Sequence, residues 1–204
     1  MIMNNSKRLI VSVTGASGAI YAVRFLRQAA LVYDKIYLIL SDNAAAVYTT
    51  ETGKKLPVPY TLSDYLGEDA TFDNIEILDS GSYFTPPASG SFVHHGMVVI
   101  PCSMGTLGRI ANGISNDLTT RAADVCLKER RKLVLVARET PLNLIHLKNM
   151  VSATEAGAIV LPACPSFYNH PASIEDIIDT IVARVLQNLD VPQQILPQWQ
   201  IENE

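Results

Sequence analysis

The stretch LIVSVTGASGA, residues 9–19, joins an apolar run to a turn made of small residues. Leu9 to Val13 has the length and the composition of a buried strand, and Gly18 to Ala30 then places apolar residues at helical spacing. A strand that leads through a small-residue turn into a helix is the opening unit of a parallel α/β sheet. We therefore expect this stretch to supply the first strand, turn and helix of such a fold.

Predicted strands and helices continue to follow one another to the end of the chain. Its apolar runs lack period-two alternation, which is typical of strands buried on both faces. The sequence predicts a single-domain α/β fold, a parallel sheet with helices on both faces. Strands are expected at 9–13, 35–40, 97–100, 133–137 and 158–161, and helices at 18–30, 43–50, 117–131, from the cap Thr140 with Pro141 next, and from Ser173 to about 189.

We treat residues 1–204 as a single domain, with an extended tail from about residue 190 that carries Trp199. We predict that the proline-containing segment 53–92 lies outside the regular strand–helix pattern and contains a functional loop at Thr85 to Ser91. With 48% hydrophobic and only 18% charged residues, the chain is not a disordered or coiled-coil protein, and we expect it to associate with itself.

Charge and cysteine content narrow the class of partner and the compartment. The net charge of -4 argues against nucleic acid as a partner, since phosphate binding favours a basic face. The three cysteines include no C-x-x-C pair, and no apolar run reaches the length of a membrane helix. We therefore expect a cytoplasmic protein without a membrane span. The four histidines lack metal-ligand spacing, so we predict no metal site.

Small, hydroxyl-bearing or charged residues follow each predicted strand, where ligands bind in open α/β sheets. Gly15-Ala-Ser-Gly18 opens a helix and suits either a nucleotide phosphate or a flavin edge, or it is simply a tight capped turn. It lacks the G-x-G-x-x-G pattern of dinucleotide sites. Ser103 and Thr106 begin the next helix and read equally as an anion-binding nest or as caps. Cys102 has no histidine motif beside it and reads as a buried apolar residue.

Arg138 and Glu139 differ from the small and hydroxyl-bearing residues at the other strand ends, because they place two opposite charges together. The arginine suits a phosphate and the glutamate a proton transfer, and the alternative is a local salt bridge. Arg121 and Lys128 share a helix face, which by itself indicates a solvated surface. Tyr168 could donate to a phosphate or simply be half-buried.

Several stretches in the same order resemble the UbiX family, the flavin prenyltransferases. The resemblance runs from Leu9 to about Trp199. It is carried by residues 14–19, Glu51, residues 86–91, 101–104, 121–125, 127–131, 133–136, 138–141 and 165–168.

This resemblance implies a homododecameric FMN-binding flavoprotein with a flavodoxin-like or Rossmann-like fold and with sites between subunits. Its activity would be a prenyl transfer in which a dimethylallyl group from dimethylallyl phosphate is joined to N5 and C6 of reduced FMN. The product, prenylated FMN, would serve a UbiD-type decarboxylase, in ubiquinone biosynthesis or in aromatic-acid breakdown. Older descriptions called the family itself a decarboxylase. No metal is needed if the protein supplies the positive charge at the phosphate.

The family's site residues carry over by position. Ser17, Glu51 and Glu139 match polar groups assigned to proton handling. Tyr83 and Gly105 depart from relatives that place a tryptophan or a lysine there. The matches to FMN contacts are Gly15, Ala16, Ser17, Ser41, Ser103, Thr106 and Arg138, and those on the prenyl-phosphate side are Ser89, Gly90, Arg121, Lys128, Glu139, Tyr168 and Arg184.

Three other functions remain possible interpretations of the sequence. An FMN-dependent decarboxylase of the cysteine-decarboxylase type would share the fold. Its histidine-centred site is expected after the first helix, but no histidine occurs before His94. A nicotinamide-dependent oxidoreductase would use Asp42 on a ribose, although the glycine fingerprint is missing. A non-catalytic flavin-binding oligomer would show the same binding residues, so only turnover distinguishes it.

Overall fold

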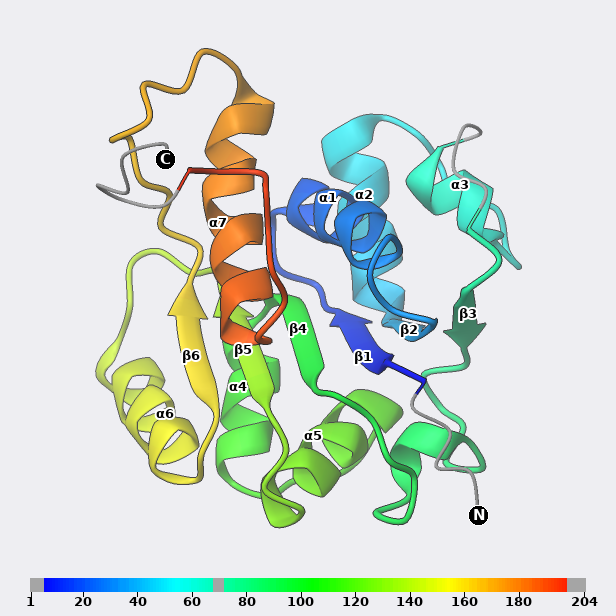
Figure 1. Cartoon of the computed structure of the whole chain (residues 1–204). Helices are drawn as coiled ribbons and strands as arrows, with labels where there is room; N and C mark the ends of the chain where they lie inside the picture. The colour runs from blue at the N-terminus through cyan, green and yellow to red at the C-terminus, as the bar shows by residue number, and fades with distance from the viewer. Residues whose placement is uncertain (1–5, 68–71, 198–204) are drawn as a thin grey trace.

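The structure is a computed structural model that describes residues 6–67 and 72–197. Within them a six-stranded sheet has the order β3-β2-β1-β4-β5-β6, and every neighbouring pair is parallel (Figure 1). The chain changes winding direction between β1 and β4, which makes their carboxyl ends the switch point of the sheet. The strands are β1 (Arg8–Val13), β2 (Lys35–Leu40), β3 (Ile75–Leu78), β4 (Met97–Cys102), β5 (Leu133–Ala137) and β6 (Ile159–Pro162).

Helices cover both faces of this sheet. Along β1, Leu9 and Val11 face one core and Ile10 faces the other, as the period of a strand requires. One face packs on α1 (Ala19–Ala29), α2 (Asp42–Thr52), α3 (Leu62–Leu66) and α7 (Ile174–Asn188), and the other on α4 (Met104–Ala111), α5 (Leu118–Lys128) and α6 (Leu144–Glu155). The α/β fold class predicted from the sequence is confirmed.

The five predicted strands all form, and the structure adds β3 at the sheet edge. This strand lies inside the segment that we expected to be irregular, together with α3 and a short 3-10 turn at Pro86–Ala88. Ile75 and Leu78 are buried, Ile77 is half-buried and Glu76 is exposed, so the four residues show no period of two. Such a short edge strand carries too few apolar residues to stand out from a loop. Without it the order would be 2-1-3-4-5, so β3 alone produces the 3-2-1-4-5-6 order.

The expected helix start at Thr140 is wrong. α6 begins at Leu144, and its cap is Asn143, whose side chain accepts the His146 N–H at 2.8 Å. The pair Thr-Pro resembles a helix start, but Asn143 offers the same capping chemistry closer to the apolar run. The helix expected to reach Arg131 ends at Lys128, because Arg130 takes a left-handed conformation with φ 56°.

Two further expectations concern the chain as a whole. The tail stays outside regular structure from Asp190 to Pro197, and Trp199 lies outside the described residues. In the described ranges no helix combines the length and the hydropathy that crossing a membrane demands.

Candidate functional site

The switch point is built by hydrogen bonds between the ends of β1 and β4. The Thr14 hydroxyl donates to the Pro101 carbonyl at 2.8 Å and accepts the Ser103 N–H at 2.9 Å. A Cβ on Gly15 would lie 2.5 Å from the Cβ of Asn43, so glycine lets the first turn pass close to the start of α2. The two loops are therefore locked side by side at the carboxyl edge of the sheet.

A cavity of about 670 Å³ opens at this point. The caps of two helices face it: the Ser41 hydroxyl accepts the Ala44 N–H at 3.1 Å, and the Ser103 hydroxyl accepts the Thr106 N–H at 3.3 Å. Both serines therefore cap helices, as the plainer interpretation predicted, and also present oxygen atoms to a cavity. Its lining includes Thr14, Gly15, Ser41, Ser103, Gly105 and Thr106.

The same cavity has lining residues that we did not expect from the sequence, among them Asn43, Ser80 and Arg109. Arg109 donates to the Thr106 hydroxyl at 3.2 Å and pairs with Asp117 at 2.5 Å. Asn43 directly follows Ser41 and Asp42, the two residues after β2. Searching one residue further from the end of this strand would therefore have found it. Ser80 follows β3, the strand that the sequence did not reveal.

A second cavity, of about 530 Å³, lies on the other side of the Gly15–Ser17 turn. Ser17, Arg138 and Glu139 supply its polar groups. In the described chain the Arg138 guanidinium forms no ion pair or hydrogen bond, and a Glu139 carboxylate oxygen accepts the Thr140 N–H at 3.0 Å. The local salt bridge is therefore not formed, and a cation faces the cavity unneutralised. Apolar walls come from Leu142, Met150, Pro162 and Ala163.

The N-terminus of α1 is already occupied by a side chain of the protein. The two carboxylate oxygens of Glu51 accept the N–H groups of Gly18 and Ala19, each at 2.8 Å. Gly18 itself takes φ 113°, and a Cβ there would lie 2.7 Å from the Tyr21 ring. Because a helix N-terminus favours an anion, Glu51 fills the position where this fold type holds a phosphate.

Four residues of the predicted prenyl-phosphate side lie together elsewhere. Gly90 stands beside Lys128, which pairs with Glu129 at the end of α5. Arg121, near the start of the same helix, donates at 3.1 Å to the carbonyl of Ala88, the residue before Ser89. α5 runs toward the amino ends of β4 and β5, the edge of the sheet opposite to Arg138 (Figure 1). One chain therefore does not bring these residues to the two cavities.

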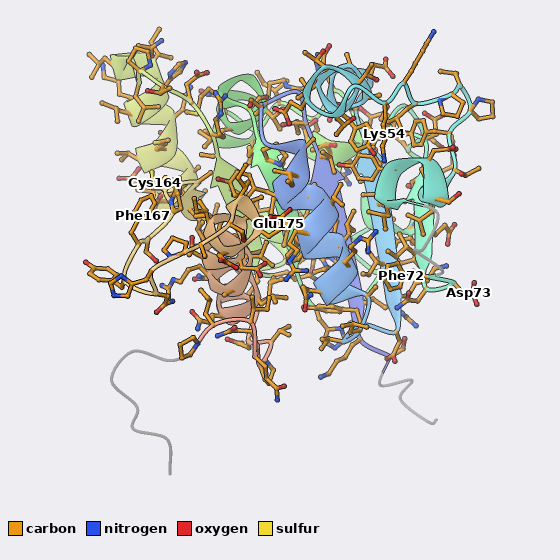
Figure 2. All side chains as sticks on the ribbon, turned by 90° about the horizontal axis from the view of Figure 1, so that it is seen from above. Lys54, Phe72, Asp73, Cys164, Phe167 and Glu175 are labelled. Carbon is orange, nitrogen blue, oxygen red and sulfur yellow. The ribbon has the colours of Figure 1, made fainter. Side chains whose placement is uncertain are left out.

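Tyr168 and Arg184 lie in a third place. Tyr168 is 73% exposed in the loop after β6. Arg184 on α7 donates to Gln187 at 2.8 Å and lines a hollow of about 490 Å³ with Cys164 and Thr180. In Figure 2 Cys164 and Phe167 mark this side of the molecule, well apart from Lys54.

The structure also shows the surroundings of Cys102, Tyr83 and Gly105, the remaining residues singled out from the sequence. Cys102 is fully buried, and burial raises the pKa of its thiol to about 12, so it is a packing residue as predicted. Tyr83 donates its hydroxyl to the Ser115 carbonyl at 3.2 Å. A Cβ on Gly105 would meet nothing within 4 Å. In the residues that the structure describes, no three histidine, cysteine or acidic side chains cluster as metal ligands would.

Comparison with known proteins adds the family. The profile of the family described as Flavoprotein matches residues 2–186. The flavin prenyltransferase UbiX of Pseudomonas aeruginosa is 44% identical over 200 residues, covering 97% of this chain and 96% of that protein.

Solved structures agree with this relationship. AnUbiX (PadA1), solved in complex with FMN and dimethylallyl pyrophosphate, is 39% identical with a TM-score of 0.83, covering 98% of this chain and 100% of that one. A dodecameric FMN-dependent UbiX-like decarboxylase from Escherichia coli O157:H7 is 39% identical with a TM-score of 0.83, covering 95% of this chain and 99% of that one.

Proposed function

The chain belongs to the flavoprotein family and, within it, to the UbiX flavin prenyltransferases, and on this premise we propose its reaction. It transfers a dimethylallyl group to N5 and C6 of reduced FMN and releases the donor's phosphate. The observation that carries the proposal is the unpaired Arg138 guanidinium, which faces a cavity beside Ser17 and Glu139. A buried or half-buried cation without a protein partner is best explained by an anionic ligand.

The residues present fit FMN. A cavity rich in hydroxyl groups and a second cavity with apolar walls lie on either side of one small-residue turn, which suits a molecule with a phosphorylated polyol chain and a flat ring. When bound, reduced FMN supplies the nucleophilic ring atoms. The residues that we propose to hold it are Gly15, Ala16, Ser17, Ser41, Ser103, Thr106 and Arg138, within a single FMN-binding domain.

The donor's phosphate needs positive charge as the allylic C–O bond breaks, because the leaving group gains charge in that step. We propose that Arg121, Lys128 and Arg184 supply it, with hydrogen bonds from Ser89, Gly90 and Tyr168. We take dimethylallyl phosphate as the donor, while the solved relative holds the pyrophosphate. Forming both bonds would release the N5 and C6 protons of reduced FMN. One proton would be needed at C2 of the dimethylallyl group, which becomes saturated, and Glu139, or the released phosphate, would accept the other. Ser17 assists the proton transfer, and Glu51 holds its turn in place.

Because these phosphate groups lie at separate places on one chain, the proposed site requires a second copy. The outer side of α6 supports such association: Leu144, Ile145 and Val151 are 64%, 68% and 57% exposed. A helix that is apolar on its solvent side normally has that side covered. We therefore propose a homododecamer, as in the Escherichia coli relative, with sites between copies.

The rival functions fit this geometry less well. A dinucleotide would place its pyrophosphate on the N-terminus of α1, where Glu51 already sits. The cysteine-decarboxylase reading is not favoured by relatives that are named flavin prenyltransferases. The product, prenylated FMN, would pass to a UbiD-type decarboxylase.

The test is an anaerobic turnover assay. Purified protein, reduced FMN and dimethylallyl phosphate are mixed, and the extracted flavin is weighed by mass spectrometry. We expect a flavin heavier by one prenyl unit, and Glu139→Gln should slow its formation while FMN stays bound. Glu155→Gln, an exposed change at the end of α6, is the matched control. Unmodified flavin from protein that has bound FMN would contradict the proposal.

A further inference from the structure

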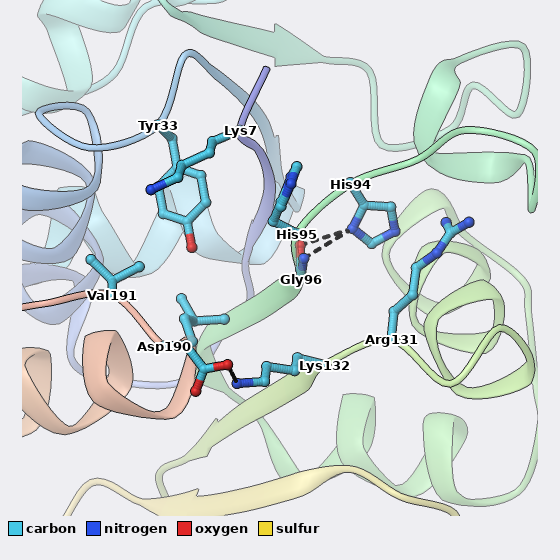
Figure 3. A pocket seen from close by; sticks show the side chains of 10 residues that line it. Lys7, Tyr33, His94, His95, Gly96, Arg131, Lys132, Asp190 and Val191 are labelled. Atoms are coloured by element: carbon cyan, nitrogen blue, oxygen red, sulfur yellow. Dashed lines mark hydrogen bonds and ion pairs between the residues drawn. The ribbon is translucent and has the colours of Figure 1, made fainter. Parts of the chain in front are cut away.

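A cavity of about 360 Å³ lies between the start of β4, the start of β5 and the end of α7 (Figure 3). It stands at the amino edge of the sheet, opposite to the two cavities described above, and shares no lining residue with them. Nothing in the proposed reaction uses it. Its lining consists of Lys7, Tyr33, His94, His95, Gly96, Arg131, Lys132, Leu189, Asp190 and Val191.

The charge of this lining is mostly positive. Lys7, Arg131 and Lys132 are cations, and Asp190 is the one carboxylate among the lining residues. Asp190 pairs with Lys132, and its side chain is 80% exposed, so it lies at the rim. Arg131 is turned toward the preceding loop, where it donates to the carbonyls of Gly90 and Phe92 at 2.7 and 2.6 Å. Arg131 therefore adds to the positive charge around the cavity, while two of its N–H groups are bonded to this loop.

The two histidines play different parts. His94 is buried, and its Nδ1 lies 3.0 Å from the Gly96 carbonyl oxygen. Burial lowers the pKa of His94 to about 4, so it forms a neutral wall at pH 7. His95 accepts the Arg8 N–H on Nδ1 at 3.1 Å, which leaves its other ring nitrogen for a ligand or solvent.

Tyr33 supplies the observation that points to a ligand. The residue is only 4% exposed, and Figure 3 shows its hydroxyl directed into the space between Lys7 and Asp190. In the described ranges this hydroxyl has no hydrogen-bond partner. Burial raises the pKa of Tyr33 to about 12, so the hydroxyl keeps its proton and remains a donor at pH 7. In the described residues the Tyr65 hydroxyl is the fully buried side-chain oxygen without a partner, whereas the Tyr33 hydroxyl can be reached from the cavity. It can therefore donate to a bound group or to water.

We propose that this cavity is a second anion site, which binds a phosphate group through the Tyr33 hydroxyl and the ammonium groups of Lys7 and Lys132. A phosphate group has several oxygens that accept hydrogen bonds, and these three donors come from separate segments: Lys7 precedes β1, Tyr33 follows α1 and Lys132 precedes β5. Leu189 and Val191 give the cavity an apolar wall, which would accept the organic part of a phosphate monoester. The same chemistry describes inorganic phosphate and a phosphate monoester.

The experiment is equilibrium dialysis of radiolabelled inorganic phosphate against FMN-loaded protein. Tyr33→Phe removes one hydrogen bond to a charged group and should weaken this binding about tenfold. Lys7→Gln should weaken it by a similar factor. The hydrogen bonds between Lys7 and Asp34 use the backbone of Lys7, so they survive this change. Lys54→Gln, an exposed lysine outside every cavity described above, is the matched control.

Phosphate bound elsewhere remains in both variants, so the difference from the unaltered protein measures this cavity alone. FMN content should be the same in all four proteins. Stronger displacement of the label by glycerol 3-phosphate than by unlabelled phosphate would identify a monoester site, and weaker displacement a site for free phosphate. Equal phosphate binding in the unaltered protein, Tyr33→Phe and Lys7→Gln would overturn the proposal.

Discussion

The helices α1 and α4 begin side by side at the switch point, yet their N-termini are used in opposite ways. The N–H groups of Gly18 and Ala19 in α1 are satisfied by the carboxylate of Glu51. α4 is capped only by the hydroxyl of its own Ser103 and opens onto the 670 Å³ cavity. In sequence both are small-residue turns after an apolar strand.

This difference shows that a strand, a small-residue turn and a helix predict an anion position without saying which anion fills it. At α1 the anion is part of the protein, contributed from a residue 32 positions later. At α4 the position stays available to a ligand. The following substitutions test that contrast, in order of decreasing effect.

Gly15→Ala should have the largest effect. Its Cβ would lie 2.5 Å from the Cβ of Asn43, so the start of α2 or the first turn must shift. We expect the free energy of unfolding to fall by about 1–3 kcal/mol, as at other overpacked sites, and FMN binding to weaken. Thermal unfolding and flavin titration measure both effects. Gly105 lines the same cavity, and a Cβ there would meet nothing within 4 Å, so Gly105→Ala should leave stability unchanged or higher. Equal stability and equal FMN binding in the two variants would refute the argument.

Glu51→Ala should come next. It leaves two N–H groups of α1 without their charged acceptor, which we expect to cost about 1–2 kcal/mol of stability. Glu51→Gln keeps one acceptor oxygen and should lose less. Chemical unfolding of the three proteins gives the comparison. An unchanged stability in Glu51→Ala would mean that water replaces the carboxylate at no cost.

Ser103→Ala removes the cap of α4 and one oxygen from the cavity. The loss of a serine cap costs about 1 kcal/mol. We expect a similar loss of FMN affinity, because the same hydroxyl is proposed to contact the flavin. Ser173→Ala removes the cap of α7, away from both cavities, and should reduce stability without changing FMN affinity. Equal FMN binding in the two variants would remove Ser103 from the site.

Gly105→Lys should have the smallest effect on stability. The position is open, so the change should stay within about 0.5 kcal/mol, as most surface substitutions do. The added cation stands at the cavity of α4 and should tighten FMN binding a few-fold, an effect that weakens as salt is added. Fluorescence titration at low and high salt checks this. Weaker binding at low salt would show that no phosphate sits near α4.

The residues of the candidate site were predictable to different degrees. Ser41, Ser103 and Arg138 follow apolar strands directly, so the rule that ligands bind at strand ends locates them at the cavities. Ser80 follows the short strand β3, whose four residues give no clear period, and it was missed. The resemblance supplied Lys128, but no local pattern could show that it lies at the opposite edge of the sheet from Arg138.

By itself the sequence determined five of the six strands, most helices and the small polar residues that follow those five strands. These follow from periods of two and 3.6 residues and from caps, which act over neighbouring residues. Only the tertiary structure decided that Glu51 fills the N-terminus of α1, that Arg138 stays unpaired and that Tyr33 lines the cavity at the amino edge of the sheet. Those contacts join residues far apart in the chain, and packing between elements, rather than any local preference, brings them together.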